Sequence, residues 1–229
     1  NYFASLGICL ALSDLLWLAP TTPVLRRAGA GIAIVFLMYC ASVTNLRARE
    51  WSDPFRFSSS EAAKHPQSPR ATYDLARTLV VMTKYRTDSP LIGETLRALE
   101  IARQSPRNGI LPDQASLIFS ARVGSPMPEA WWKDMQDKLR RLPIGPQELS
   151  AIAALTDCAV AKRCDFPHAQ MLATFDAAAS SGPNPEVMNM RGNYVLNILG
   201  DSAQTLRLWQ QAVALRPAER QYRISLAKL

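Results

Sequence analysis

The chain has 229 residues, of which 48% are hydrophobic and 20% are charged, and its formal net charge is +7. This length suits one or two domains. A positive charge can indicate a nucleic-acid partner, but here lysine and arginine are scattered among acidic residues and no basic run is interleaved with aromatic residues. We therefore expect no nucleic-acid partner, and we expect the basic residues near a membrane to face anionic lipid headgroups.

Apolar residues concentrate at the N-terminal end, where residues 1–46 carry only three charged side chains, Asp14, Arg26 and Arg27. Residues 28–46 have none, and as a helix they would span about 28 Å, close to the ~30 Å of a bilayer's hydrocarbon core. Residues 2–20 form another apolar stretch, interrupted by Asp14. The sequence therefore predicts two transmembrane helices joined by a short basic loop at 20–28. A buried core helix is the alternative for the second.

Basic residues beside these spans predict how the chain crosses the membrane. Arg26 and Arg27 lie in the loop between the spans, which the positive-inside tendency places in the cytoplasm. Everything after residue 46 would then lie outside, which in a bacterium is the periplasm. Arg47 and Arg49 favour the opposite orientation, but they begin a large domain, where the tendency has less weight. We expect a bacterial inner-membrane protein whose main domain is periplasmic.

Cys158 and Cys164 lie six residues apart and would point to different sides of one continuous helix. If the helix ends near Ala161, the chain can fold back and bring them within bonding distance. A disulfide would fit an oxidising compartment, and the sequence leaves open whether it forms. Metal binding is disfavoured because the histidines, His65 and His168, form no ligand spacing with these cysteines.

The remainder of the sequence predicts short amphipathic helices separated by proline, glycine and aspartate, with no sustained strand pattern. The predicted stretches are 52–65, 69–84, 89–104, 112–122, 127–140, 146–161, 167–179, 185–199, 202–215 and 218–229. Short connections between such helices predict antiparallel neighbours.

Two segments show the spacing of a helical repeat. Residues 200–217 resemble the second half of a tetratricopeptide repeat: a Gly-Asp turn, then Trp209 and Ala212 on one helix face, then Pro217. Pro217 precedes a Leu-Ala pair at 226–227 by nine residues, and Pro66 precedes another such pair, at 75–76, by the same nine. The predicted fold is therefore all-α, with two N-terminal transmembrane helices followed by a tetratricopeptide-like α-α superhelical domain over 47–229. The last repeat is expected to be cut off, and the chain, which begins in mid-pattern at Asn1, to be a fragment of a longer protein.

No nucleophile setting, phosphate-binding glycine loop or zinc spacing occurs in the sequence. We therefore expect no catalytic, cofactor-binding or metal-binding residue in this chain. The pair Trp131-Trp132 predicts one ring in the core and one at a helix rim, and a peptide-binding or membrane-surface role is the alternative. In a repeat array, the first helix of each pair lines a partner-binding groove, and arginine and tyrosine suit extended peptides. The register predicts six exposed groove residues: Arg70, Tyr73, Arg77, Met190, Tyr194 and Asn197.

The order of the parts resembles a known family. The apolar helices open with Tyr2, Ser5 and Gly7 in the pattern Y-x-x-S-x-G, and the second leads into Trp51 and Asp53 ahead of the repeats. This arrangement is similar to the C-terminal part of O-mannosyltransferases that contain tetratricopeptide repeats, and of their bacterial relatives in the GT-C class of membrane glycosyltransferases.

This resemblance implies a membrane-anchored domain that mediates protein–protein interaction as the acceptor- or partner-binding part of a glycosyltransferase. Catalysis in that class resides in loops between earlier helices, which this chain does not include, so no catalytic residue is carried over. The alternative is a non-enzymatic scaffold or assembly factor for cell-envelope machinery.

Overall fold

The computed structural model describes residues 7, 10–11, 22–105, 109–141, 143–227 and 229. Every regular element in these ranges is a helix, which confirms the predicted all-α class for the described residues. The chain divides into two compact units, Asn1–Phe57 and Ser58–Leu229.

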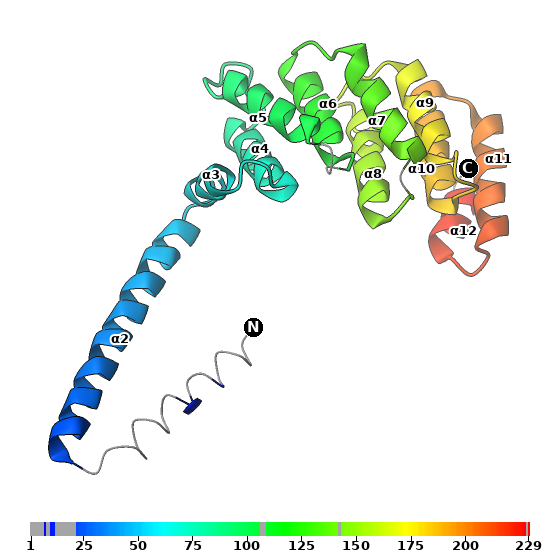
Figure 1. Ribbon diagram of the computed structural model, residues 1–229. Coiled ribbons are helices and arrows are strands. Elements are labelled where there is room, and N and C mark those ends of the chain that lie inside the picture. The colour runs from blue at the N-terminus through cyan, green and yellow to red at the C-terminus, as the bar shows by residue number, and fades with distance from the viewer. Residues whose placement is uncertain (1–6, 8–9, 12–21, 106–108, 142, 228) are drawn as a thin grey trace. The chain divides into compact units, whose positions relative to one another are not determined.

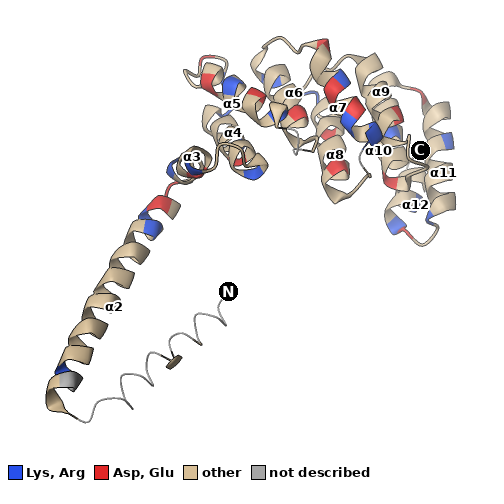
Figure 2. Cartoon of the chain, viewed as in Figure 1, with Lys and Arg blue, Asp and Glu red and all other residues tan. Residues whose placement is uncertain are grey.

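The first unit contains one long apolar helix, α2 (Pro23–Trp51). Pro23 occupies its first turn, where the missing N–H is not needed. Charged residues lie only toward the two ends of α2, as Figure 2 shows. Among the described residues, Arg27–Trp51 is the one stretch that is long and apolar enough to cross a membrane. The predicted span at 28–46 lies inside it.

The side chains of α2 are exposed, with Ile32 at 72% and Val35 at 63%, so α2 is not the buried core helix that the sequence left as an alternative. The other predicted span, residues 2–20, lies outside the described residues except for Gly7, Leu10 and Ala11. Beyond α2, Asp53 starts the next helix, α3 (Pro54–Lys64). Its Oδ1 accepts hydrogen bonds from the backbone N–H groups of Phe55 at 2.8 Å and Arg56 at 2.9 Å, as an N-cap does.

The second unit continues with a series of short helices (Figure 1). They are α4 (Pro69–Thr83), α5 (Ile92–Gln104), α6 (Leu111–Val123), α7 (Glu129–Arg141), α8 (Pro146–Val160), α9 (His168–Ala178), α10 (Pro185–Tyr194) with its π-helical extension η1 (Val195–Leu199), α11 (Ser202–Leu215) and α12 (Arg220–Ala227). Each falls on a predicted stretch. Capping residues explain several boundaries: Asn184 and Asp201 accept hydrogen bonds from the first turns of α10 and α11, and Gly124 ends α6 with φ +72°.

These helices pack in alternation. Along one row α4 contacts α6, α6 contacts α8 and α8 contacts α10; in a second row α7 contacts α9. Sequential helices such as α4 and α5, or α10 and α11, also pack on each other. Several helices, from α4 and from α6 to α10, therefore bury apolar side chains against the next helix but one, whereas α5 and α11 pack on their neighbours in the sequence.

The core of this unit lies between the rows, around large side chains from α6 to α10. Trp132 is 1% exposed and its ring meets Phe166 edge-on, with the centroids 5.4 Å apart. Trp131 remains half-buried and lies against the guanidinium of Arg103, 4.9 Å from its Cζ to the ring centroid. The predicted division of the tryptophan pair between core and rim is confirmed.

Helices α10 and α11 come close together where Gly192 of α10 faces Trp209 of α11. A Cβ on Gly192 would overlap the indole ring of Trp209. The same contact is held by polar groups, because Trp209 Nε1 donates to the Asn189 carbonyl at 3.2 Å and Thr205 Oγ1 donates to the Gly192 carbonyl at 3.3 Å. Only glycine leaves room for the indole here.

We predict that Gly192→Ala lowers the free energy of unfolding by about 1–3 kcal/mol, because the methyl group overpacks this contact. The matched control is Gly93→Ala in α5, where an added Cβ meets nothing. That change should stabilise the protein by ~0.5–1 kcal/mol through helix propensity. Denaturant titration followed by circular dichroism measures both; two variants of equal stability would contradict the close approach.

A buried ionic network joins α5, α6 and α7. The guanidinium of Arg103 contacts Asp113 at 3.1 Å, Asp134 at 2.8 Å and Glu100 at 2.7 Å, and Lys138 Nζ contacts the other oxygen of Asp113 at 2.6 Å. The Asp113 side chain is 0% exposed. Its burial raises the pKa of that carboxyl, and Lys138 and Arg103 oppose the rise. Two cations on separate helices therefore compensate one buried carboxylate.

We predict that Arg103→Met costs about 3–5 kcal/mol of unfolding free energy, because it leaves the Asp113 charge only half compensated. Arg97→Met, at an exposed position of the same helix, should be nearly neutral.

The loss in Arg103→Met should also depend on pH. The pKa of Asp113 rises further in this variant, so its folded state binds a proton that the unfolded state releases, and the variant regains stability as pH falls from about 7 to about 4.5. A loss that stays constant over this range would contradict the buried charge.

Candidate partner-binding site

The three predicted groove residues of α4 share one helix face. Arg70, Tyr73 and Arg77 follow each other at intervals of three and four; both arginines are exposed and the tyrosine is half-buried. Burial raises the pKa of Tyr73, and the charge of Arg77 opposes this. Arg70 Nε lies 3.6 Å from the Asp74 carboxylate. The two arginines are exposed as the register predicts, whereas Tyr73 is only partly exposed, and a role of this face in partner binding stays a prediction.

Two residues that the sequence did not single out extend this face. Tyr85 follows α4, and Arg122 of α6 lies over its ring with Cζ 3.4 Å from the centroid. The Tyr85 ring also approaches Phe119 of α6, with the centroids 6.1 Å apart. Helical spacing could not reveal these contacts, because they join a turn to a helix about forty residues further along the chain.

The three predicted residues of the late helix behave differently. Asn197 is exposed and its side-chain amide donates to the Asn193 carbonyl at 2.8 Å, while Met190 is half-buried against the core. Tyr194 is 1% exposed, so its predicted exposure was wrong. Its ring packs on Phe175, and its hydroxyl lies 2.9 Å from His168 Nδ1. Burial raises the pKa of the Tyr194 phenol. The six candidates therefore do not form one surface, because α6 and α8 separate α4 from α10 in the row.

A small hollow of about 230 Å³ lies beside Tyr194, where α8, α9 and α10 meet. Its lining combines charged and polar groups with apolar ones: Ala159, Lys162, Cys164, Asp165, Phe166, His168, Tyr194 and Ile198. The hollow is large enough for a side chain or a few atoms of a ligand. Its mixture of one acid, one lysine and one histidine selects no single ligand chemistry.

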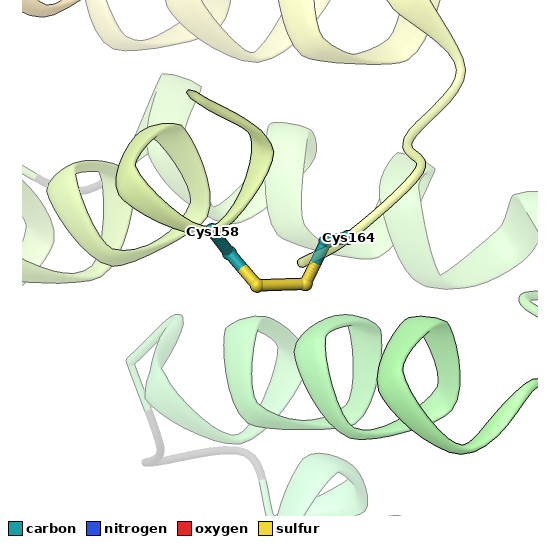
Figure 3. Close-up of a disulfide and its surroundings, with 2 residues drawn as sticks. All are labelled: Cys158 and Cys164. Atoms are coloured by element: carbon teal, nitrogen blue, oxygen red, sulfur yellow. A yellow bond between two sulfur atoms is a disulfide. The ribbon is translucent and has the colours of Figure 1, made fainter. Parts of the chain in front are cut away.

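Cys164, which lines this hollow, forms a disulfide with Cys158, as Figure 3 shows. Helix α8 ends at Val160, and Lys162 adopts the left-handed conformation with φ 53°, which reverses the chain. The N–H groups of Arg163 and Cys164 then donate to the Cys158 carbonyl at 3.0 and 3.2 Å. This is the reversal near Ala161 on which the predicted bond depended, and it brings the two Cα atoms to 5.3 Å.

We predict that a reductant lowers the melting temperature of the protein, because opening this short loop costs ~2 kcal/mol. The double variant Cys158→Ala, Cys164→Ala should melt at that lower temperature with or without reductant. Calorimetry of both proteins measures this. A wild-type protein that is insensitive to reductant, with its thiols shown to be free, would contradict the assignment.

Two features bear on where the chain resides: the apolar helix that the structure describes near the N-terminus, and the disulfide. Together they are consistent with a domain outside the cytoplasm. Comparison of the chain with protein-family models, with curated proteins and with solved structures finds no match. The function is therefore inferred from the residues and their geometry.

Proposed function

We propose that residues 47–229 form a tetratricopeptide-like repeat domain that binds protein or peptide partners. One observation carries the proposal: helices stack on the next helix but one, the arrangement by which repeat arrays build an extended binding surface. The face of α4 supplies arginine and tyrosine, residue types that are enriched at interaction hot spots.

The proposal also covers the compartment in which the domain lies and the larger protein to which it belongs. Helix α2 anchors it in a bacterial inner membrane, and the repeats lie in the periplasm. The disulfide supports this compartment. The order of apolar helices, Trp51, Asp53 and repeats supports a role as the partner- or acceptor-binding C-terminal part of a membrane glycosyltransferase. A scaffold for cell-envelope assembly is the alternative, with the same fold and no sugar transfer.

Site-specific photo-crosslinking tests partner binding. A photoreactive amino acid in place of Arg70, on the proposed face, should capture a protein partner in cells, and Arg77→Glu should reduce that capture severalfold while the melting temperature stays the same. The control position is Arg97, which is exposed on the neighbouring helix α5. Equal capture from Arg70 and Arg97, or none from Arg70, would contradict the proposed face.

Reporter fusions after Leu229 test the compartment. An alkaline phosphatase fusion should be active and a β-galactosidase fusion inactive, because the domain is placed outside the cytoplasm. The reverse result would overturn the periplasmic assignment. The glycosylation of a captured partner then distinguishes the glycosyltransferase from the scaffold. A partner that loses its glycan when the chain is deleted supports the glycosyltransferase. A partner that carries no glycan supports the scaffold.

A further inference from the structure

The turn after α4 holds Tyr85 in an unusual backbone conformation. Lys84 and Tyr85 have φ values of 50° and 56°, in the left-handed region that side chains other than glycine rarely adopt. The Tyr85 N–H donates to Thr83 Oγ1 at 3.1 Å, which fixes the turn. Strained residues of this kind gather at functional positions, where the surrounding structure maintains them. The strain here fixes where the Tyr85 ring lies.

The guanidinium of Arg122, from α6, lies over that ring. Its guanidinium carbon is 3.4 Å from the Tyr85 centroid, and the residue is half-buried. No carboxylate pairs with it among the described residues. Arg103, in the same fold, contacts three carboxylates. An arginine that is partly removed from water normally gains such partners. Because Arg122 has none among the described residues, its guanidinium keeps free N–H donors, and stacking on Tyr85 already orients them.

Arg77 adds a second unpaired cation beside this pair. It is exposed, and no carboxylate pairs with it within the part of the chain that the structure describes. Tyr73 lies one helical turn before Arg77 on α4, and the charges of Arg77 and Tyr85 both influence the pKa of Tyr73. The nearest acid on this helix face, Asp74, already contacts Arg70. We call Tyr73, Arg77, Tyr85 and Arg122 the arginine–tyrosine cluster; its charge is positive and uncompensated.

We infer that the arginine–tyrosine cluster binds an acidic segment of a partner polypeptide, with one carboxylate on Arg122 and another on Arg77. The inference rests on the proposed function and adds the chemistry of the partner. A planar guanidinium fork matches a carboxylate through two parallel hydrogen bonds. The two arginines come from different helices, α4 and α6, so an extended segment with more than one acidic side chain suits them better than a single terminal carboxylate.

The probes are synthetic peptides, used with the full chain in detergent. A fluorescent peptide with several glutamates spaced by glycine and serine, amidated at its C-terminus, should bind. The same peptide with glutamine for glutamate should bind at least tenfold more weakly. Arg122→Gln should weaken binding of the glutamate peptide about tenfold or more, as expected for losing hydrogen bonds between charged groups. Arg97→Gln is the matched control and should change nothing.

Further variants separate positioning from folding. Tyr85→Phe keeps the stacked ring and should keep the affinity, whereas Tyr85→Ala should weaken it. Lys84→Gly should raise the melting temperature, because glycine accepts the left-handed conformation, and yet lower the affinity by loosening the Tyr85 ring. A merely structural turn would make Lys84→Gly more stable without changing binding, and that result would overturn the role given to Tyr85.

Three outcomes would overturn the inference: equal binding of the glutamate and glutamine peptides, unchanged binding by Arg122→Gln, or binding only to a peptide with a free C-terminal carboxylate. Binding to anionic phosphatidylglycerol vesicles but not to the peptide would overturn it as well. The photoreactive amino acid in place of Arg70 would still be expected to capture a protein partner in cells after any of these results. The failure of the inference and the failure of the proposed function are therefore distinguishable.

Discussion

The structure of the helical unit depends on packing between helices, and from α6 to α10 each helix packs on the next helix but one. A helix of 10 to 15 residues, the length found from α4 to α11, cannot bury its own apolar side chains and is marginal alone in water. The contacts from α6 to α8, α8 to α10 and α7 to α9 supply that burial. Proline and glycine in the connections between the helices limit the length of each helix, so that it does not extend beyond the helices that bury it. The same packing leaves one face of α4 exposed, and this is the face on which we propose that a partner binds.

The helices could be predicted from the sequence because their boundaries are local. Proline in the first turn, an acceptor at the N-cap and glycine at the end are read directly from consecutive residues, and α4, α6, α8 and α10 all begin with such a proline. The partners of each helix are not local. Gly192 fits Trp209, and Arg103 meets Asp113 and Asp134, only after the chain has folded. No spacing in the sequence marks these residues as special.

The candidate site shows the same limit. Arg70, Tyr73 and Arg77 could be placed on one face because helical register alone decides it. Tyr194 could not, since its burial depends on His168 and Phe175 from α9. Arg122 and Tyr85 were missed because their stacking joins α6 to a turn whose left-handed backbone the residue types do not suggest. Two arginines thus have contrasting surroundings. Arg103 contacts three carboxylates and joins three helices, whereas Arg122 stacks on Tyr85 and has no carboxylate partner among the described residues.

Crosslinking between helices tests the stacking most directly. Gln136 of α7 donates from Nε2 to Oε1 of Gln170 at 2.9 Å, across the contact between α7 and α9. In the full chain, Gln136→Cys combined with Gln170→Cys should be joined by a short bifunctional thiol reagent, as mass spectrometry of the linked peptides would show. Gln136→Cys combined with Ser150→Cys, on the sequential helix α8, should not be joined. Efficient linkage of the second pair and none of the first would contradict the alternating arrangement.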